Sequence, residues 1–335
     1  MPDSNSRLSL TSLNDEAALR IFRTVATIQY MEDRITRGLN SGEFSMTFYP
    51  VRGQEAIPAA ISEHLRPDDY MVTTYRGMHD CIAKGIPLGE MIAEMLGKVT
   101  GTSKGKGGPM HLSDPRSGVM VTSGIVGGGL PIAVGLALAS RLRKTDQVTV
   151  VNFGDGATSI GATHEAVNLA ALWQLPVVFV CQHNGYGEHT QFSDYTRTER
   201  LADRFRTYGM RAITVDGNSV PELYEASGEA INAARAGRGP TFLECLTYRL
   251  EGHSFGADTS YMDAERLAQA RKAEPIGRYR EWLKDRGIAE SALEGIEKEV
   301  AEESEIAFRD AKSADYPGID ELLVDVFSSK EAVPQ

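Results

Sequence analysis

Cysteine is scarce in this sequence of 335 residues, and its pattern excludes two classes of protein. Cys81, Cys181 and Cys245 lie far apart, and none belongs to a CxxC pair or to another metal-ligand spacing. This pattern argues against a disulfide framework and against a structural zinc site. We therefore expect three buried, reduced thiols.

Long apolar runs and an excess of positive charge are also lacking. No run approaches the roughly 20 apolar residues of a membrane-spanning helix. The formal net charge of −11 argues against nucleic acid or an anionic membrane surface as the main partner. The polar residues 1–12 contain no apolar core of a signal peptide, so we expect a cytoplasmic protein. The length allows two domains or one large α/β domain with helical extensions.

Residues 148–190 form the stretch around which the chain is organised. Two β-branched runs, 148–153 and 177–181, flank a segment in which Val167, Ala170 and Trp173 recur at near-helical spacing. This pattern predicts a parallel β-α-β unit. Further predicted elements alternate along the chain: strands at 70–75, 211–215 and 241–248, and helices at 198–208 and 221–236. The alternation predicts an α/β fold, a mostly parallel sheet with helices on both faces.

Two polar residues follow the two central strands. Asp155, within Gly154-Asp155-Gly156, ends the first strand, and Asn184 follows the second. In a right-handed crossover both lie at the same edge of the sheet, where their oxygens suit Mg²⁺. The amide groups at the start of the helix after Gly156 suit a diphosphate. An ordinary tight turn is the alternative, and the β-α-β context makes it the weaker one.

With its GDG, its spacer and its Asn, this unit resembles the thiamine-diphosphate-dependent enzymes. Over roughly residues 14–325 the chain is most similar to the alpha subunit of the dehydrogenase component of 2-oxo acid dehydrogenase complexes, of the pyruvate, branched-chain and acetoin types. The resemblance implies the thiamine-diphosphate-binding fold, with thiamine diphosphate and Mg²⁺ as cofactors. It also implies Asp155, Asn184 and the carbonyl of Tyr186 as metal ligands. His183 stands where the family commonly has a first Asn.

Two other segments carry cofactor contacts in this resemblance. An arginine after a strand, as in Tyr75-Arg76, can clamp a diphosphate. The glycine-rich residues 100–129 suit close approach to a ligand or, alternatively, a flexible surface loop. The resemblance implies that the backbone of Gly124 and Val126 binds the aminopyrimidine ring. The full set of implied cofactor contacts is Tyr75, Arg76, Gly124, Val126, Asp155, Gly156, Ala157, Asn184, Tyr186 and Arg249.

Two histidines are candidate catalytic residues. His253 lies on a loop after a predicted strand, and a side chain that titrates near neutrality suits proton transfer there, although a solvated loop histidine fits equally well. The resemblance favours the catalytic role. His111 is the second candidate, with a structural role equally open. Tyr49 stands where many members have a His, and Tyr261-Met262 where they have Tyr-Arg, so one phosphate contact is expected to be missing.

Helical segments flank the predicted cofactor domain. Residues 13–39 read as an amphipathic helix capped by Asn14, which packs on the sheet or at a subunit contact. The apolar helix at 130–142 is expected to be buried, and in the family it lies in the core or at an interface. We expect a helical extension at 1–40, the cofactor domain at 41–262 and a helical extension at 263–335.

The resemblance implies a heteromeric enzyme. The family needs a glutamate from a separate pyrimidine-binding domain, for which this chain has no room, so we expect a beta subunit and two copies of each chain. The implied reaction is oxidative decarboxylation of a small 2-oxo acid with acyl transfer to a lipoyl acyltransferase. The alternatives are cleavage of a hydroxyketone by an acetoin dehydrogenase, a non-oxidative carboligase or transketolase-like enzyme, and a non-catalytic scaffold.

Overall fold

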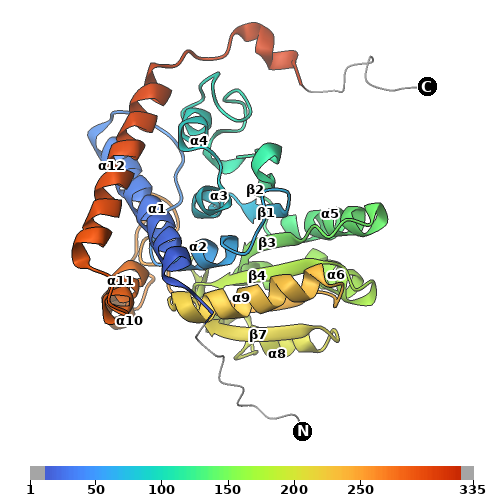
Figure 1. Ribbon diagram of the computed structural model, residues 1–335. Coiled ribbons are helices and arrows are strands. Elements are labelled where there is room, and N and C mark those ends of the chain that lie inside the picture. The colour runs from blue at the N-terminus through green and yellow to red at the C-terminus, as the bar shows by residue number, and fades with distance from the viewer. Residues whose placement is uncertain (1–11, 326–335) are drawn as a thin grey trace.

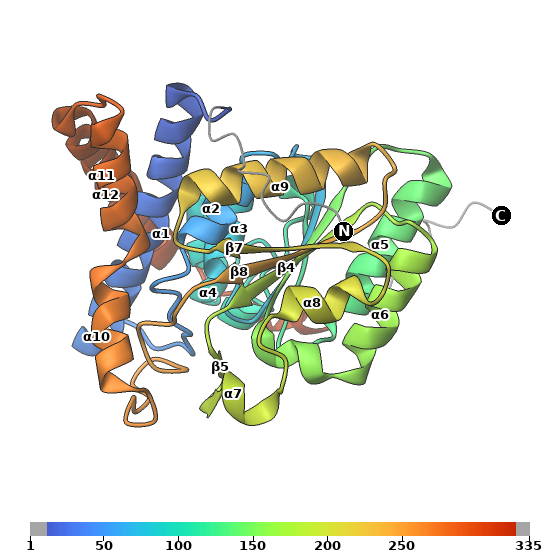
Figure 2. The same cartoon turned by 90° about the horizontal axis from the view of Figure 1, so that it is seen from below.

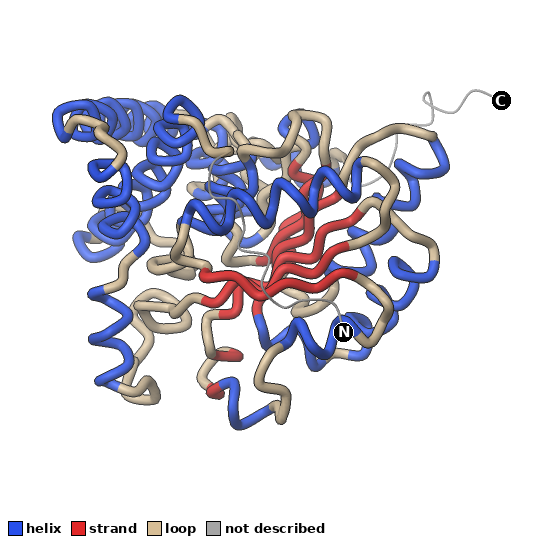
Figure 3. The backbone as a smooth tube through the Cα atoms, turned by 60° about the horizontal axis from the view of Figure 1, so that its bottom comes forward, coloured by secondary structure: helices blue, strands red, loops and turns tan. Residues whose placement is uncertain are grey.

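A six-stranded parallel sheet forms the centre of the protein in the computed structural model, which describes residues 12–325 (Figure 3). The strand order is β2-β1-β3-β4-β8-β7, and every pairing in this sheet is parallel. The strands are β1 Tyr70–Thr74, β2 Val119–Ser123, β3 Thr149–Gly154, β4 Val177–His183, β7 Arg211–Asp216 and β8 Thr241–Leu246. A separate hairpin pairs β5 Tyr186–Gly187 with β6 Thr190–Gln191. The predicted mostly parallel sheet is confirmed.

Helices cover both faces of the sheet, as predicted (Figure 2). Side chains alternate along each strand, so Val150 and Val178 belong to the core beneath one set of helices, whereas Val151 and Phe179 belong to the other. The first face is covered by α1 Asp15–Ser41, α2 Ala56–Ser62 and α9 Val220–Arg235. The second face is covered by α5 Gly129–Arg143, α6 Gly161–Leu172 and α8 Leu201–Arg206. The remaining helices are α3 Met78–Lys84, α4 Leu88–Met95, α7 Phe192–Tyr195, α10 Ala264–Lys272, α11 Pro275–Asp285 and α12 Glu290–Ser313.

The first and last long helices lie side by side, although they come from opposite ends of the chain (Figure 1). Asn14 caps α1 as predicted, because its Oδ1 accepts the Ala17 N–H at 2.9 Å. Arg23 of α1 forms ion pairs with Glu299 and Glu303 of α12. The helical N- and C-terminal regions are therefore confirmed. The division into domains at residues 40 and 262 stays a prediction.

Several local expectations are corrected by the structure. The helix α5 is not buried all round, because Ile132 is 42% exposed and Leu142 is 73% exposed. A 3₁₀ turn at Asp155–Ser159 and the extended Ile160 precede α6, so no α-helix starts directly after Gly156. The glycine-rich segment contains the unpredicted strand β2, and the helix predicted at 198–208 is limited to α8.

Other expectations are confirmed or untested. The three cysteines are free and buried, as predicted. Among residues 12–325, no helix combines the length and the apolar character that crossing a membrane requires. The residues used to predict a cytoplasmic location lie outside the described part of the chain, apart from Ser12, so that location stays a prediction.

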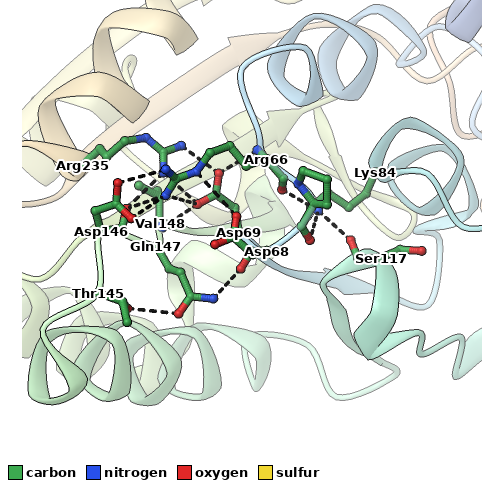
Figure 4. Close-up of polar contacts among 11 residues, drawn as sticks. Arg66, Asp68, Asp69, Lys84, Ser117, Thr145, Asp146, Gln147, Val148 and Arg235 are labelled. Carbon is green, nitrogen blue, oxygen red and sulfur yellow. Dashed lines mark hydrogen bonds and ion pairs between the residues drawn. The ribbon is translucent and has the colours of Figure 1, made fainter.

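A buried ion pair fixes the amino edge of the sheet (Figure 4). Asp69 is fully buried, and its two carboxylate oxygens accept from both terminal nitrogens of Arg235, at 3.0 and 2.7 Å. The same carboxylate accepts the main-chain N–H groups of Arg66 and Val148, each at 2.8 Å. Nearby, the Lys84 ammonium donates to the carbonyl oxygens of Arg66, Pro67 and Ser117. These contacts tie together the starts of β1 and β3 and the end of α9.

We predict that Asp69→Ala lowers the free energy of unfolding by about 3–5 kcal/mol, because it leaves the Arg235 guanidinium and two buried N–H groups unpaired. Denaturant unfolding of the variant and the wild type measures this difference. Glu229→Ala, which removes the exposed ion pair with Arg211, is the matched control and should change stability by only about 0.5 kcal/mol. Equal effects of the two substitutions would contradict the structural role of Asp69.

Candidate functional site

A cavity of about 320 Å³ opens at the carboxyl edge of the sheet, beyond the ends of β1, β3 and β4. Ligands of open parallel sheets bind in this position because the loops after the strands converge there. Most of the residues predicted from the sequence line it: Tyr75, Arg76, Val126, Gly156, Ala157, Asn184, Tyr186, Arg249 and His253. Asp155 is fully buried between Gly154 and Gly156, which also line the cavity.

The Asp155 carboxylate is satisfied at one oxygen only. Its Oδ2 accepts the Tyr195 hydroxyl at 2.5 Å, whereas its buried Oδ1 has no hydrogen-bond partner in the described part of the chain. Burial raises the pKa of this carboxyl, against the lowering effect of His183, the Tyr195 hydroxyl and nearby main-chain N–H groups. A buried acidic oxygen without a partner fits a hard cation.

Asn184 lies beside this carboxylate in the wall of the cavity. Its Nδ2 donates to Gln54 Oε1 at 3.0 Å, and its Oδ1 accepts the Tyr186 N–H at 3.2 Å. The hydrogen bond that Asn184 donates to Gln54 fixes which way the amide points and leaves its oxygen to accept the Tyr186 N–H. Among residues 12–325, no cluster of three His, Cys, Asp or Glu side chains could hold a metal. A cation here would therefore need amide and carbonyl oxygens, and oxygens of a bound anion.

Gln54 itself is positioned by a glycine. Gly53 has φ +94°, and a Cβ at this residue would lie 2.4 Å from the Tyr248 carbonyl oxygen, so only glycine fits. Glu55 accepts the Gly53 N–H at 2.9 Å and holds the turn. The sequence GQEA was the only signal for Gln54, and sequence reasoning assigned it no role in the site.

Two buried arginines give the cavity its charge. Arg76 donates to the carbonyl oxygens of Pro50 at 2.6 Å and His253 at 2.9 Å. Arg249 donates to the Glu188 carbonyl at 2.7 Å and to the Tyr261 hydroxyl at 2.5 Å. Neither arginine forms an ion pair with any residue in the range 12–325. Burial and the repulsion from Arg249 lower the pKa of Arg76 to about 10.

Buried charges without a counter-charge are costly, so this arrangement favours a bound anion with more than one negative charge. A diphosphate fits the two guanidinium groups, and a cation at Asp155 would offset the charge that remains.

His253 forms part of an aromatic wall beside Arg76. Its ring centroid lies 5.4 Å from that of Tyr49, which in turn lies 4.5 Å from that of Tyr75. Burial, followed by repulsion from Arg76, Arg249 and His189, lowers the pKa of His253 to about 4. Arg76 Nη2 lies 3.2 Å from His253 Nδ1, and a guanidinium can only donate. The neutral ring therefore carries its hydrogen on Nε2.

Besides the buried Asp155, two predicted residues do not line this cavity. His111 is exposed and borders a separate hollow with Met46, Met95 and Met110. Its Cε1 lies 4.0 Å from the place where a Cβ on Gly124 would stand, so the two residues are neighbours beside the main cavity. The predicted roles of His111 and Gly124 stay predictions.

Neighbouring residues accommodate the departures from the family pattern. His183 Nδ1 lies 3.0 Å from the buried carboxylate of Glu244, which also accepts the main-chain N–H groups of Leu201 and Ala202. Met262 packs with Tyr186, Tyr248 and Leu250 in a small apolar cluster.

Besides Gln54, four residues of the site were missed from the sequence. Tyr195 contacts Asp155 from 40 positions away, and no local pattern marks it. Asp80, Gln182 and Asn152 line the deep part of the cavity, where Gln182 Nε2 donates to Asp80 at 2.9 Å. Both polar atoms of the Asn152 amide are buried without a partner among the described residues. The run of apolar residues around Asn152 in β3 concealed its position at the cavity.

Comparison with known proteins identifies the family. The family described as "Dehydrogenase E1 component" matches residues 23–320, which is most of the chain. The chain belongs to this family. Its members depend on thiamine diphosphate, in agreement with the anion-binding cavity.

Curated relatives are similar over almost their whole length. The alpha subunit of acetoin:2,6-dichlorophenolindophenol oxidoreductase from Bacillus subtilis is 40% identical over 321 residues, 96% of each chain. The subunit of the same name from Cupriavidus necator is 37% identical over 325 residues, covering 95% of this chain and 96% of the relative. The pyruvate dehydrogenase E1 component subunit alpha from Rhizobium meliloti is 32% identical over 320 residues, 95% and 92% of the two chains. The chain is thus a dehydrogenase alpha subunit of the 2-oxo acid and acetoin dehydrogenase type.

The low pKa of His253 predicts a pH-dependent stability. Between pH 6.5 and about 4 the unfolded chain binds a proton at this residue and the native chain does not, so His253 destabilises the fold as the pH falls through this window. In His253→Gln this contribution is absent, and the free energy of unfolding should fall less steeply over the same window. Denaturant unfolding at several pH values gives the free energy of unfolding of both proteins as a function of pH. Because the carboxyl groups titrate alike in the two proteins, their contribution cancels when the two slopes are subtracted. Identical slopes would contradict a neutral His253.

Proposed function

We propose that this chain binds Mg²⁺ and thiamine diphosphate and, as an alpha subunit, catalyses oxidative decarboxylation of a small 2-oxo acid. The observation that carries this proposal is the pair of buried arginines, Arg76 and Arg249, which lack a carboxylate partner in the described chain and border the cavity above the unpaired Oδ1 of Asp155. A magnesium diphosphate satisfies both deficits at once. Few other small ligands combine a divalent cation with a compact anion of this kind.

The proposed roles of the residues follow from their contacts. Asp155, Asn184 and the Tyr186 carbonyl would hold the cation. Arg76, Arg249 and the N–H groups of Gly156 and Ala157 would hold the diphosphate, and the backbone of Gly124 and Val126 would contact the ring. When bound, thiamine diphosphate would supply a nucleophilic carbon for a substrate carbonyl and a ring that takes up the electron pair of the neighbouring bond.

His253 is the proposed catalytic residue, acting as a hydrogen-bond donor. Because its Nε2 carries the hydrogen, the neutral ring can donate a hydrogen bond to an oxygen that becomes negatively charged during the reaction. Its low pKa keeps the ring neutral near pH 7, and Arg76 fixes its orientation. The Tyr49 ring beside it restricts the space for the substrate on this side.

Cleavage of acetoin is the second candidate reaction. The 40% and 37% identical relatives are named for acetoin, whereas the Rhizobium pyruvate dehydrogenase subunit is 32% identical. In either reaction the acyl group would pass to a lipoyl acyltransferase. A non-oxidative carboligase and a non-catalytic scaffold are less well supported, because the matched family is a dehydrogenase and the cavity keeps Arg76, Arg249 and the buried Asp155 beside it.

A beta subunit is the proposed partner. Large apolar side chains are exposed around the cavity mouth and on the adjoining helices α5 and α6: Ile125, Val126, Ile132, Leu142, Leu169, Leu172 and Trp173. Exposed apolar groups in such number are typical of an interaction surface. We infer that they meet a beta subunit that completes the site, in an assembly of two alpha and two beta chains.

We predict that Asp155→Ala lowers the affinity for thiamine diphosphate in the presence of Mg²⁺ by on the order of 100-fold or more, because a ligand charge is lost beside a bound diphosphate. Calorimetric titration of the full chain, prepared with its beta subunit, measures this affinity. Asp203→Ala, which removes an exposed carboxylate on α8, is the matched control and should leave the affinity unchanged. Unchanged binding by Asp155→Ala would overturn the proposed metal site.

A second prediction concerns His253→Ala. The rate of reduction of an artificial electron acceptor should fall by roughly 10²–10⁴-fold with pyruvate, branched 2-oxo acids or acetoin as substrate, while the melting temperature stays near that of the wild type. Acyl transfer to a lipoyl domain is assayed separately, because a loss in that step alone would place His253 at the handover. Wild-type rates in both assays would show that His253 is not catalytic, and no turnover of any substrate by the wild type would refute the proposed reaction.

A further inference from the structure

The hydrogen bond from Tyr195 to Asp155 affects how the Asp155 carboxylate can bind a cation. We propose that Tyr195 acts as a selectivity-determining positioning residue: its hydroxyl occupies Asp155 Oδ2, leaves only Oδ1 for a cation and so favours Mg²⁺ over Ca²⁺. This inference rests on the metal site proposed above and deepens it. Nothing in the similarity to the relatives assigns a role to Tyr195.

The hairpin β5–β6 brings Tyr195 to the carboxylate. After Asn184 the chain leaves the sheet, forms the hairpin and returns through α7, which ends at Tyr195 (Figure 2). Two glycines allow close packing: a Cβ on Gly156 would lie 3.2 Å from Gly187 Cα, and a Cβ on Gly187 would lie 3.4 Å from the Tyr195 ring. The Tyr195 ring thus rests on Gly187, which lies against the turn that carries Asp155.

Contacts on both sides of Tyr195 fix its position. The Phe192 ring packs edge-on against Tyr195, with centroids 5.5 Å apart, and lies 4.2 Å from the His183 ring. On the other side, Arg204 donates to Thr196 Oγ1 at 2.5 Å and to the Thr158 carbonyl at 3.2 Å. One arginine therefore links the residue after Tyr195 to the turn after Asp155. The hydroxyl and the carboxylate are held together by the fold as well as by their own hydrogen bond.

Mg²⁺ and Ca²⁺ differ in how they bind a carboxylate, so the hydrogen bond from Tyr195 affects the two cations differently. Mg²⁺ requires near-octahedral geometry and takes one oxygen from each carboxylate, whereas the larger Ca²⁺ takes six to eight oxygens and readily binds both oxygens of one carboxylate. A hydroxyl that donates to Oδ2 competes with two-oxygen binding and leaves single-oxygen binding intact. It also orients the carboxylate, an effect that typically contributes 10–100-fold to metal affinity.

The test is the ratio of Mg²⁺ to Ca²⁺ affinity in Tyr195→Phe, a change that removes only the hydroxyl. Thiamine diphosphate binding to the full chain, prepared with its beta subunit, is titrated calorimetrically at increasing Mg²⁺ and, separately, Ca²⁺. We expect the variant to need about tenfold more Mg²⁺ than the wild type to bind thiamine diphosphate, and its affinity for Ca²⁺ to change less. The ratio of Mg²⁺ affinity to Ca²⁺ affinity should therefore fall by nearly tenfold. Tyr208→Phe is the matched control, because it removes a hydroxyl that contacts His164 Nδ1, away from the cavity.

Each result decides between the alternatives. A lower ratio in Tyr195→Phe together with a wild-type ratio in Tyr208→Phe supports the inference. Equal losses for both cations, or no change for either, overturn it. If wild-type binding of thiamine diphosphate proves independent of divalent cations and Asp155→Ala binds normally, the metal site itself is wrong. That outcome differs from a failure of the selectivity role alone, in which the wild type depends on metal and Asp155→Ala does not bind.

Discussion

The cavity of this protein depends on two guanidinium groups that are buried without a counter-charge among the described residues. Arg76 follows β1 and Arg249 follows β8, strands that are separated by β3 and β4 in the sheet order. Their charges meet only because parallel strands direct their following loops to one edge. The carbonyl oxygens of Pro50, His253 and Glu188 solvate them in part, but the two positive charges still repel each other. Binding of an anion removes this repulsion, so ligand binding and folding stability are coupled.

The two edges of the sheet differ in how their buried carboxylates are matched. At the amino edge, Asp69 pairs with Arg235 and accepts two main-chain N–H groups, so the buried charge is fully matched. At the carboxyl edge, Asp155 Oδ1, Gln54 Nε2 and both polar atoms of Asn152 lack partners among the described residues. Unpaired buried polar groups are rare in finished cores, and their concentration at one cavity indicates a ligand that completes them.

The sequence allowed the sheet, and most of the residues that line its cavity, to be predicted, because both depend on local patterns. The β-branched runs at 148–153 and 177–181 marked β3 and β4, and Asp155 and Asn184 followed them directly. By contrast, the short β-branched run of β2, Val119–Ser123, is surrounded by glycines that favour a loop, and the exposure of Leu142 on α5 depends on how many neighbours cover the helix. Tyr195, Asn152 and Gln54 could not be assigned to the site, because only tertiary packing determines which distant side chain reaches a carboxylate.

The departures from the family pattern affect the two ends of the cavity differently. At the cation end, His183 is the changed residue, and it forms its hydrogen bond with the buried carboxylate of Glu244. Asn184 therefore keeps its own hydrogen-bond partners. At the other end, Tyr49 replaces a residue that is commonly histidine, and its ring packs against both Tyr75 and His253. The bulky phenol of Tyr49 takes up space beside His253, and the site lacks the group titrating near neutrality that a histidine would provide there. The proposed cofactor contacts therefore keep their hydrogen-bond partners, whereas Tyr49 changes the shape and polarity beside His253, and substrate choice is the property in which we expect this chain to diverge most from its relatives.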